Sequence, residues 1–214
     1  MMTATCSMVT VVDHPQALMA LSRLRDEKTD SPEFRRQTRI LATPLLLAAT
    51  QGLTMSRTIV HTLLGEATGY IHDTRVVGVP VLRAGLALAE VFQEQVPAVV
   101  THHLGIARDE QTALPERYYP KNARTIFVQD YVVLLDPMLA TGGSANDALE
   151  QIYSAGGKNI RLVCVVAAKA GINAVQQRFP NVPIYTVAID PELNGDKYIV
   201  PGLGDFGDRY FGTC

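Results

Sequence analysis

Residues 132–147 have the sequence VVLLDPMLATGGSAND, and the predicted fold is arranged around this stretch. The four apolar residues at its start are typical of a parallel strand that is buried on both faces. Residues 145–153 have the pattern of a helix, and a glycine turn over residues 141–144 precedes it. A strand that leads through such a turn into a helix directs unpaired backbone N–H groups at one point, and the positive end of the helix dipole adds to them. The stretch therefore predicts an anion-binding site.

The residues of the turn indicate the kind of anion. Gly142 and Gly143 allow the backbone to close around a phosphate, and the hydroxyls of Thr141 and Ser144 can donate hydrogen bonds. The turn contains no lysine and lacks the G-x-x-x-x-G-K-[ST] spacing of nucleotide-hydrolysing enzymes. A phosphate monoester that is held by neutral donors fits better, and Asp136 is placed to meet hydroxyls of an attached sugar.

A second strand, turn and helix occupy residues 76–95. Residues 76–82, VVGVPVL, predict a buried strand, and residues 86–95 predict a helix. Arg83 stands in the turn between them, where its guanidinium group can bind phosphate oxygens in a bidentate manner. Because open α/β sheets bind ligands at the carboxyl ends of their strands, we expect Arg83 to bind a phosphate rather than to form a surface ion pair.

The remaining elements alternate in a way that predicts an α/β fold with a mainly parallel, twisted sheet flanked by helices. Two N-terminal helices are expected to begin at Pro15 and Ser31, and Pro44 should kink or break the second. Residues 53–75 predict a ribbon of short strands. Further strands are expected at residues 9–12, 96–103, 160–168 and 182–189, and a further helix at residues 171–178.

The composition excludes several classes of protein. The chain has 214 residues, 47% of them hydrophobic and 19% charged, which is typical of one globular domain of generous size. A formal net charge of −2 without a basic stripe argues against a nucleic-acid surface. No apolar run reaches about eighteen residues, so no membrane span is expected. The three cysteines are scattered, which is typical of a reducing cytoplasm, and Cys164 is expected to be a buried thiol.

Four motifs resemble one family. LLDPMLATGGS (residues 134–144) resembles the loop of phosphoribosyltransferases that binds phosphoribosyl pyrophosphate (PRPP), and Pro137 in the second acidic position resembles the uracil phosphoribosyltransferase branch. PVLRAG (residues 80–85) resembles the diphosphate-binding loop of that branch. GIARDEQT (residues 105–112) resembles a segment whose arginine reaches the diphosphate. YIVPGLGD (residues 198–205) resembles the uracil-binding hood of the same family.

The resemblance implies an enzyme of pyrimidine salvage that transfers the 5-phosphoribosyl group of PRPP to N1 of uracil, giving UMP and diphosphate. It implies one phosphoribosyltransferase domain over residues 1–214. Within that domain, residues 1–52 would form an N-terminal helical region, residues 105–129 a flexible flap, and residues 190–214 a glycine-rich hood over the base.

The resemblance also implies roles for individual residues. Catalytic roles fall to Arg83, Arg108, Asp136 and Asp205. PRPP would be bound by these four residues and by Pro137, Met138, Leu139, Ala140, Thr141, Gly142, Gly143 and Ser144. Uracil would be bound by main-chain groups of Ile199, Gly204 and Phe206, with Asp205 beside it; Phe206 stands where the family often has a small residue. Mg²⁺ would arrive with PRPP without a direct protein ligand and would meet Asp205 through water.

The N-terminal helices favour a homodimer or a larger homo-oligomer, and activation by GTP, which some relatives show, stays open. Two alternatives remain. The protein could be a related enzyme that acts on a purine or on orotate, whose carboxylate would require Lys197 or Arg209 in the hood. It could instead be an RNA-binding regulator of pyrimidine genes, although the negative net charge argues against this.

Overall fold

The computed structural model describes residues 8–108, 115–119 and 125–213. Their central sheet has eight strands in the order β1-β12-β10-β8-β4-β6-β7, with β5 also paired to β4. Neighbouring strands are parallel except for β6 and β7, so the prediction of a mainly parallel sheet is confirmed. The strands are β1 (Val9–Val11), β4 (Val76–Leu82), β5 (Val100–Thr101), β6 (Leu104–Arg108), β7 (Pro115–Tyr119), β8 (Tyr131–Leu135), β10 (Asn159–Val163) and β12 (Ile184–Thr186).

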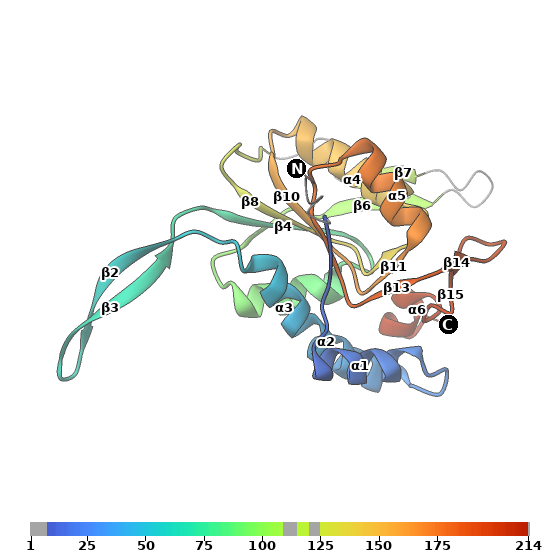
Figure 1. The fold of residues 1–214 in the computed structure, drawn as a ribbon, viewed down its shortest axis with the longest axis horizontal. Helices are drawn as coiled ribbons and strands as arrows, with labels where there is room; N and C mark the ends of the chain where they lie inside the picture. The colour runs from blue at the N-terminus through green and yellow to red at the C-terminus, as the bar shows by residue number, and fades with distance from the viewer. Residues whose placement is uncertain (1–7, 109–114, 120–124, 214) are drawn as a thin grey trace, which may run out of the picture.

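Helices cover both faces of this sheet (Figure 1). One face carries α4 (Gly143–Ser154) and α5 (Lys169–Arg178), and the other carries α1 (Pro15–Arg25), α2 (Ser31–Thr50) and α3 (Leu86–Gln95). Val132 and Leu134 pack in the core beneath α4 and α5, whereas Val133 and Leu135 pack in the core with α2 and α3. Because successive side chains of a strand point to opposite faces, a strand covered on both sides is apolar throughout.

Three of the parallel strands continue, after a short interruption, as a second small sheet. Its parallel strands are β9 (Met138–Leu139), β11 (Val166–Ala168) and β13 (Ala188–Asp190), in the order β13-β11-β9. Pro137 lies in the first interruption, and its carbonyl oxygen accepts hydrogen bonds from the backbone N–H groups of Val165 and Val166 at 2.8 and 3.2 Å. The predicted strands over residues 160–168 and 182–189 are therefore each divided in two.

Two other predictions need correction. Of the kink or break predicted at Pro44, the break is wrong, because Pro44 lies inside one continuous helix, α2, whose residues Leu41, Leu45 and Leu46 are fully buried. The predicted strand over residues 96–103 is reduced to the two residues of β5. The backbone N–H of Val96 instead caps α3 by donating to the carbonyl of Phe92 at 2.9 Å.

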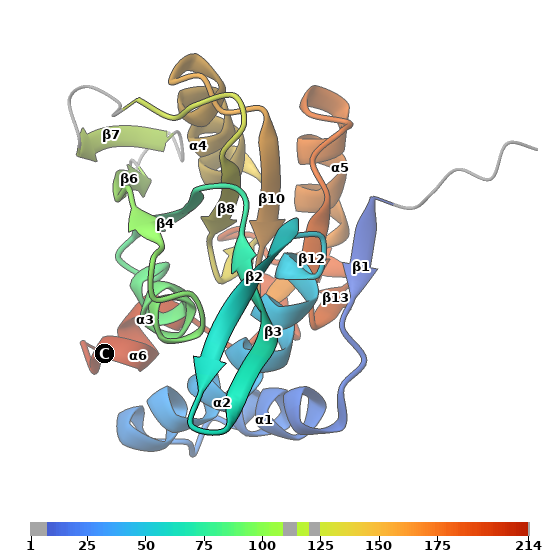
Figure 2. The same ribbon diagram turned by 90° about the vertical axis from the view of Figure 1, so that its left-hand side faces the viewer.

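Residues 53–75 form a hairpin arm, which confirms the predicted ribbon. β2 (Met55–Thr62) and β3 (Gly65–His72) are antiparallel, and the arm projects away from the body of the molecule (Figures 1 and 2). Leu63 and Leu64 at its tip are fully exposed.

The C-terminal segment, residues 190–213, contains more regular structure than the predicted coil. It forms the small hairpin of β14 (Glu192–Leu193) and β15 (Ile199–Val200), followed by α6 (Phe206–Phe211). Within the described residues, no helix is both long and apolar enough to cross a membrane. Cys164 is fully buried, as predicted, and burial raises the pKa of its thiol to about 12.

Candidate active site

The two predicted anion loops lie side by side at the carboxyl ends of β4 and β8. These strands are paired in register, with Pro80 opposite Leu135, so Arg83 and Asp136 follow neighbouring strand ends. The helix that follows β4 lies on one face of the sheet and the helix that follows β8 lies on the other (Figure 1). Such a reversal in strand order opens a crevice, which is where open α/β sheets bind ligands.

The first loop, residues 83–85, exposes its arginine and buries its glycine. The side chain of Arg83 is 57% exposed, donates a hydrogen bond to Asp208 Oδ1 at 3.1 Å and lies 5.7 Å from the ring centre of Phe211. Gly85 packs so closely that an added Cβ would lie 2.6 Å from the backbone oxygen of Val81 and would also meet the carbonyl of Leu135. The loop can therefore approach β8 only with glycine at this position.

We expect Gly85→Ala to lower the free energy of unfolding by about 1–3 kcal/mol, the usual cost of overpacking. The contacts that a Cβ would make are with backbone atoms of two core strands, which cannot move aside as a flexible side chain can. Urea denaturation measures the effect, with Gly195→Ala as the control because nothing lies within 4 Å of a Cβ there. Equal stabilities of the two variants would contradict the close packing of this loop.

The second loop, residues 136–144, places the start of α4 at the crevice. The helix begins at Gly143, two residues before the predicted start, and Gly142 is its N-cap with φ 82° and ψ 0°. Only Gly142 of the two glycines has a positive φ. A Cβ on Gly143 would meet only the hydroxyl of Thr141, at 3.6 Å, so this position faces open space. The two glycines thus have different roles: Gly142 makes the turn, and Gly143 leaves open space in front of the helix.

The hydrogen bonds within this loop leave donors available for an anion. Thr141 Oγ1 accepts from the backbone N–H of Gly143 at 3.4 Å, so its own proton remains available for a ligand. The first N–H groups of a helix have no acceptor within the helix, and they point out of its N-terminus. The half-buried Asp136 is held at the strand end by its backbone N–H, which donates to the carbonyl of Val163 at 3.1 Å.

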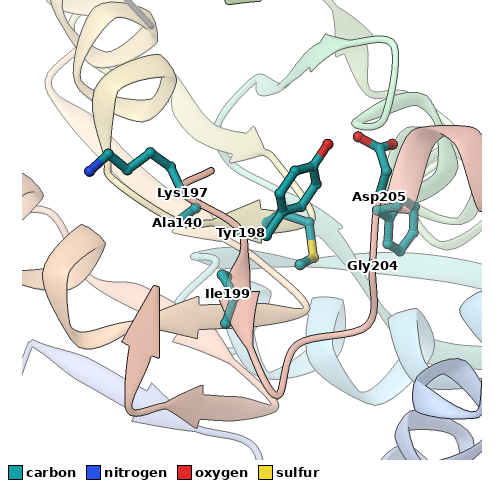
Figure 3. A pocket seen from close by; sticks show the side chains of 8 residues that line it. Ala140, Lys197, Tyr198, Ile199, Gly204 and Asp205 are labelled. Carbon is teal, nitrogen blue, oxygen red and sulfur yellow. The ribbon is translucent and has the colours of Figure 1, made fainter. Parts of the chain in front are cut away.

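The hood and the second loop enclose one pocket of about 290 Å³ (Figure 3). It is lined by Met138 and Ala140 from the loop and by Lys197, Tyr198, Ile199, Gly204, Asp205 and Phe206 from the hood. All four residues predicted for uracil thus lie together at a pocket that also reaches residues 136–144, the predicted phosphate loop. Sequence reasoning missed Tyr198 as a lining residue, although it begins the YIVPGLGD motif, and considered Lys197 only for orotate.

Arginine side chains fix the hood against α1. Asp190 accepts two hydrogen bonds from Arg25, at 2.7 and 2.8 Å, and one from the backbone N–H of Gly202 at 2.9 Å. Arg209 donates to the backbone carbonyls of Leu203 at 2.7 Å and Leu24 at 2.5 Å. Arg209 is therefore committed to the backbone of the protein, which argues against it as a partner for an orotate carboxylate.

Phe206 and Asp205 hold the end of the hood in place. The Phe206 side chain is buried, with its ring centre 5.2 Å from that of Phe34 and 5.9 Å from that of Tyr210. Its bulk is thus accommodated between Phe34 of α2 and Tyr210 of α6, and the residue still lines the pocket. Asp205 caps α6 by accepting from the backbone N–H of Asp208 at 2.8 Å, and it is exposed at the edge of the pocket (Figure 3).

Arg108 is the last residue of β6, a strand paired with β4. Its side chain, and much of the predicted flap (residues 109–114 and 120–124), lie outside the described part of the structure. The role predicted for Arg108 therefore stays a prediction.

Comparisons with known proteins find relatives that match nearly the whole chain. The family model of uracil phosphoribosyltransferase matches residues 11–213. The uracil phosphoribosyltransferase of Dictyoglomus turgidum is 44% identical over 207 residues, which are 96% of this chain and 100% of that protein. That of Finegoldia magna is 43% identical over 208 residues, which are 97% of this chain and 99% of that protein.

Two solved structures show the same fold. The AQ2163 protein from Aquifex aeolicus has a TM-score of 0.87 at 32% identity, over 95% of this chain and 97% of that chain. A hypoxanthine-guanine phosphoribosyltransferase from Bacillus anthracis has a TM-score of 0.51 at 10% identity, over 75% and 80% of the two chains, and supports the fold alone. Since the family model and these relatives span nearly the whole sequence, the chain belongs to the uracil phosphoribosyltransferase family.

Proposed function

We propose that the protein transfers the 5-phosphoribosyl group of PRPP to N1 of uracil and releases UMP and diphosphate, a reaction of pyrimidine salvage. The observation that supports this most strongly is the pocket that joins Met138 and Ala140, in the loop that leads into α4, to Ile199, Gly204 and Phe206 of the hood. PRPP carries a 5-phosphate at one end of its ribose and a diphosphate at C1. The start of α4 suits the first group, and Arg83 on the neighbouring strand end suits the second.

The residues of the pocket would act by position and electrostatics. Uracil needs donors for O2 and O4 and an acceptor for N3–H, and the main chain of the hood can supply them without a charged side chain. As the C1–O bond to diphosphate breaks, positive charge builds on the ribose, and N1 of uracil attacks C1 and gives up its proton. Arg83, together with Arg108, would neutralise the departing diphosphate, and Asp136 would hold the ribose hydroxyls.

We propose Mg²⁺ as the metal that accompanies PRPP. Mg²⁺ prefers oxygen ligands and keeps several waters, and the exposed carboxylate of Asp205 at the edge of the pocket suits a contact through water. When bound to the diphosphate, the ion adds positive charge to the leaving group. The whole chain would act as one domain in the cytoplasm, with the helical region (residues 1–52), the flap (105–129) and the hood (190–214) as its parts.

Purified protein should form UMP from uracil and PRPP only when a divalent metal is present. A turnover assay with PRPP, Mg²⁺ and a panel of uracil, orotate and hypoxanthine measures this, and addition of GTP tests activation, which rests on family likeness alone. Product from orotate or hypoxanthine but not from uracil would contradict the proposed substrate and leave only the fold and the family.

We also propose that the protein forms a homodimer or a larger homo-oligomer. An isolated two-stranded hairpin is marginally stable in water, and the arm of β2 and β3 exposes Leu63 and Leu64 fully and Ile59 to 65%. A second copy of the chain that covers the arm would remove this apolar surface from water.

The double variant Leu63→Asp/Leu64→Asp should therefore lower the molar mass in solution, as measured by light scattering, because it places charge on the surface that associates. Met19→Asp is the control, since Met19 on α1 is exposed to 71% and tests the N-terminal helices as the alternative interface. A lower mass for the Met19 variant alone would place the interface on α1 and contradict the role of the arm.

A further inference from the structure

Lys197 has an unusual backbone conformation. Its φ is 67°, and within the described part of the chain it is the only residue other than glycine with a positive φ. Two hydrogen bonds hold the turn that contains it: the backbone N–H of Lys197 donates to the carbonyl of Asn194 at 3.0 Å, and Asn194 Oδ1 accepts from the N–H of Tyr198 at 2.9 Å. Glycine would fit this left-handed position without strain, and a strained residue at a pocket is a reason to look for a use of its side chain.

The side chain of Lys197 lines the pocket and is its only positively charged lining residue. In Figure 3 the amine group lies on the side of the pocket away from Asp205, the side on which Ala140 of the phosphate loop also lies. Lys197 is exposed, and the described residues offer its amine no ion pair or side-chain hydrogen bond.

The phosphate loop lacks what Lys197 can provide. Residues 132–147 contain no lysine or arginine but do contain Asp136 and Asp147. Neutral donors and the dipole of α4 are the only attraction that the loop itself offers to a doubly charged phosphate monoester. A lysine that lines the same pocket, on the side where Ala140 lies, would add a full positive charge that the described structure does not neutralise.

We propose that Lys197 is a further PRPP-binding residue whose ammonium group binds the 5-phosphate from the hood side of the pocket. The identity of the ligand rests on the proposed function, whereas the contact with a sugar phosphate can be tested without turnover. The hood would then bind the two groups that lie at opposite ends of the product UMP: the base through its main chain and the 5-phosphate through Lys197. The strained turn would be retained because it carries the lysine to the pocket.

The test is calorimetric binding of two probes, ribose 5-phosphate and inorganic diphosphate, to the full-length protein. We expect Lys197→Met to weaken binding of ribose 5-phosphate by about 3- to 10-fold, the range for a partly exposed charged contact, and to leave diphosphate binding unchanged. Lys197→Arg should restore most of the affinity. Lys158→Met is the matched control, because Lys158 lies over the ring of Tyr153, beyond the C-terminal end of α4.

Lys197→Gly separates the charge from the backbone conformation. If the charge binds the phosphate, the glycine variant loses affinity for ribose 5-phosphate as the methionine variant does, while melting at the same or a higher temperature. Normal ribose 5-phosphate binding by both variants would overturn the inference, and so would equal weakening of both probes. If the wild type turns over orotate and Lys197→Met loses that activity at unchanged affinity for ribose 5-phosphate, the lysine contacts the base, and the inference is overturned. If the wild type makes no UMP but the methionine variant weakens ribose 5-phosphate binding selectively, the proposed function fails and this contact stands.

Discussion

Replacement of Arg83 by alanine should lower kcat/KM for PRPP by about 30- to 1000-fold, which corresponds to about 2–4 kcal/mol of transition-state stabilisation. The reason is that Arg83 follows β4 at the crevice, where the diphosphate would gather charge as it leaves C1. The affinity for uracil in a preformed complex should change less, because the hood, and not Arg83, is the proposed site for the base. Steady-state kinetics with varied PRPP, together with a thermal melt, measure the effect.

The structure supplies a specific control for this variant. Arg83 donates to Asp208 on α6 at 3.1 Å, so its loss could also act by loosening the end of the hood. The two side chains are 57% and 40% exposed, and such pairs contribute about 0–1 kcal/mol, so a diphosphate can displace Asp208 from the arginine.

Asp208→Asn removes the charge of the partner and keeps Arg83, and we expect it to retain kcat/KM within about 3-fold, as the small energy of an exposed pair implies. If this variant is as impaired as Arg83→Ala, the arginine acts on the hood rather than on the diphosphate. An unaltered rate in a folded Arg83→Ala protein would make Arg83 a surface ion-pair partner only.

The sheet could be predicted from sequence because its central strands carry a simple signal. The apolar run of β8 is continuous since Val132 and Leu134 face one layer of helices and Val133 and Leu135 face the other. The interruption between β10 and β11 carries no such signal, unlike Asp136 and Pro137 after β8. Cys164 and Val165 are as apolar and as buried as the strands on either side of them.

Tertiary packing overrode two local signals. Proline is expected to end a helix, yet α2 continues through Pro44 because Leu45 and Leu46, directly after it, are fully buried in the core. The apolar residue Val96 suggested the start of a strand, but it packs at the end of α3 instead. Propensity is a weak guide wherever burial of a whole face decides the conformation.

The candidate site was predictable as a set of loops but not in its finer geometry. The order of strands and helices placed the loops after β4 and β8 at one edge of the sheet. The sequence Gly142-Gly143 could not reveal which glycine adopts the positive φ, because both are equally free to do so. Nor could the sequence show that Lys197 lines the pocket, since this depends on the left-handed turn that follows Asn194.

Gly143→Val should abolish most PRPP binding and leave the fold nearly intact. A Cβ at position 143 meets only Thr141 Oγ1, at 3.6 Å, so the new side chain can be accommodated by the protein and projects into the open space at the start of α4. If the 5-phosphate occupies that space, we expect PRPP affinity to fall by at least about 100-fold, or about 2.7 kcal/mol. Since binding of this remote phosphate helps to position C1, kcat should fall as well.

The neighbouring glycine provides the contrast that makes this result interpretable. Gly142 has a φ of 82°, and a Cβ on it would lie 3.0 Å from both the carbonyl oxygen of Gly171 and Ala174 Cβ, so Gly142→Ala should lower the melting temperature through backbone strain. Gly143→Val should melt close to the wild type, because the helix propensity of valine is no lower than that of glycine and a Cβ at this position meets no atom closer than 3.6 Å. Calorimetric binding of PRPP beside thermal melts of both variants separates the two effects. Unchanged PRPP affinity in Gly143→Val would show that no phosphate lies at the start of α4, and the arrangement of PRPP along the crevice would have to be abandoned.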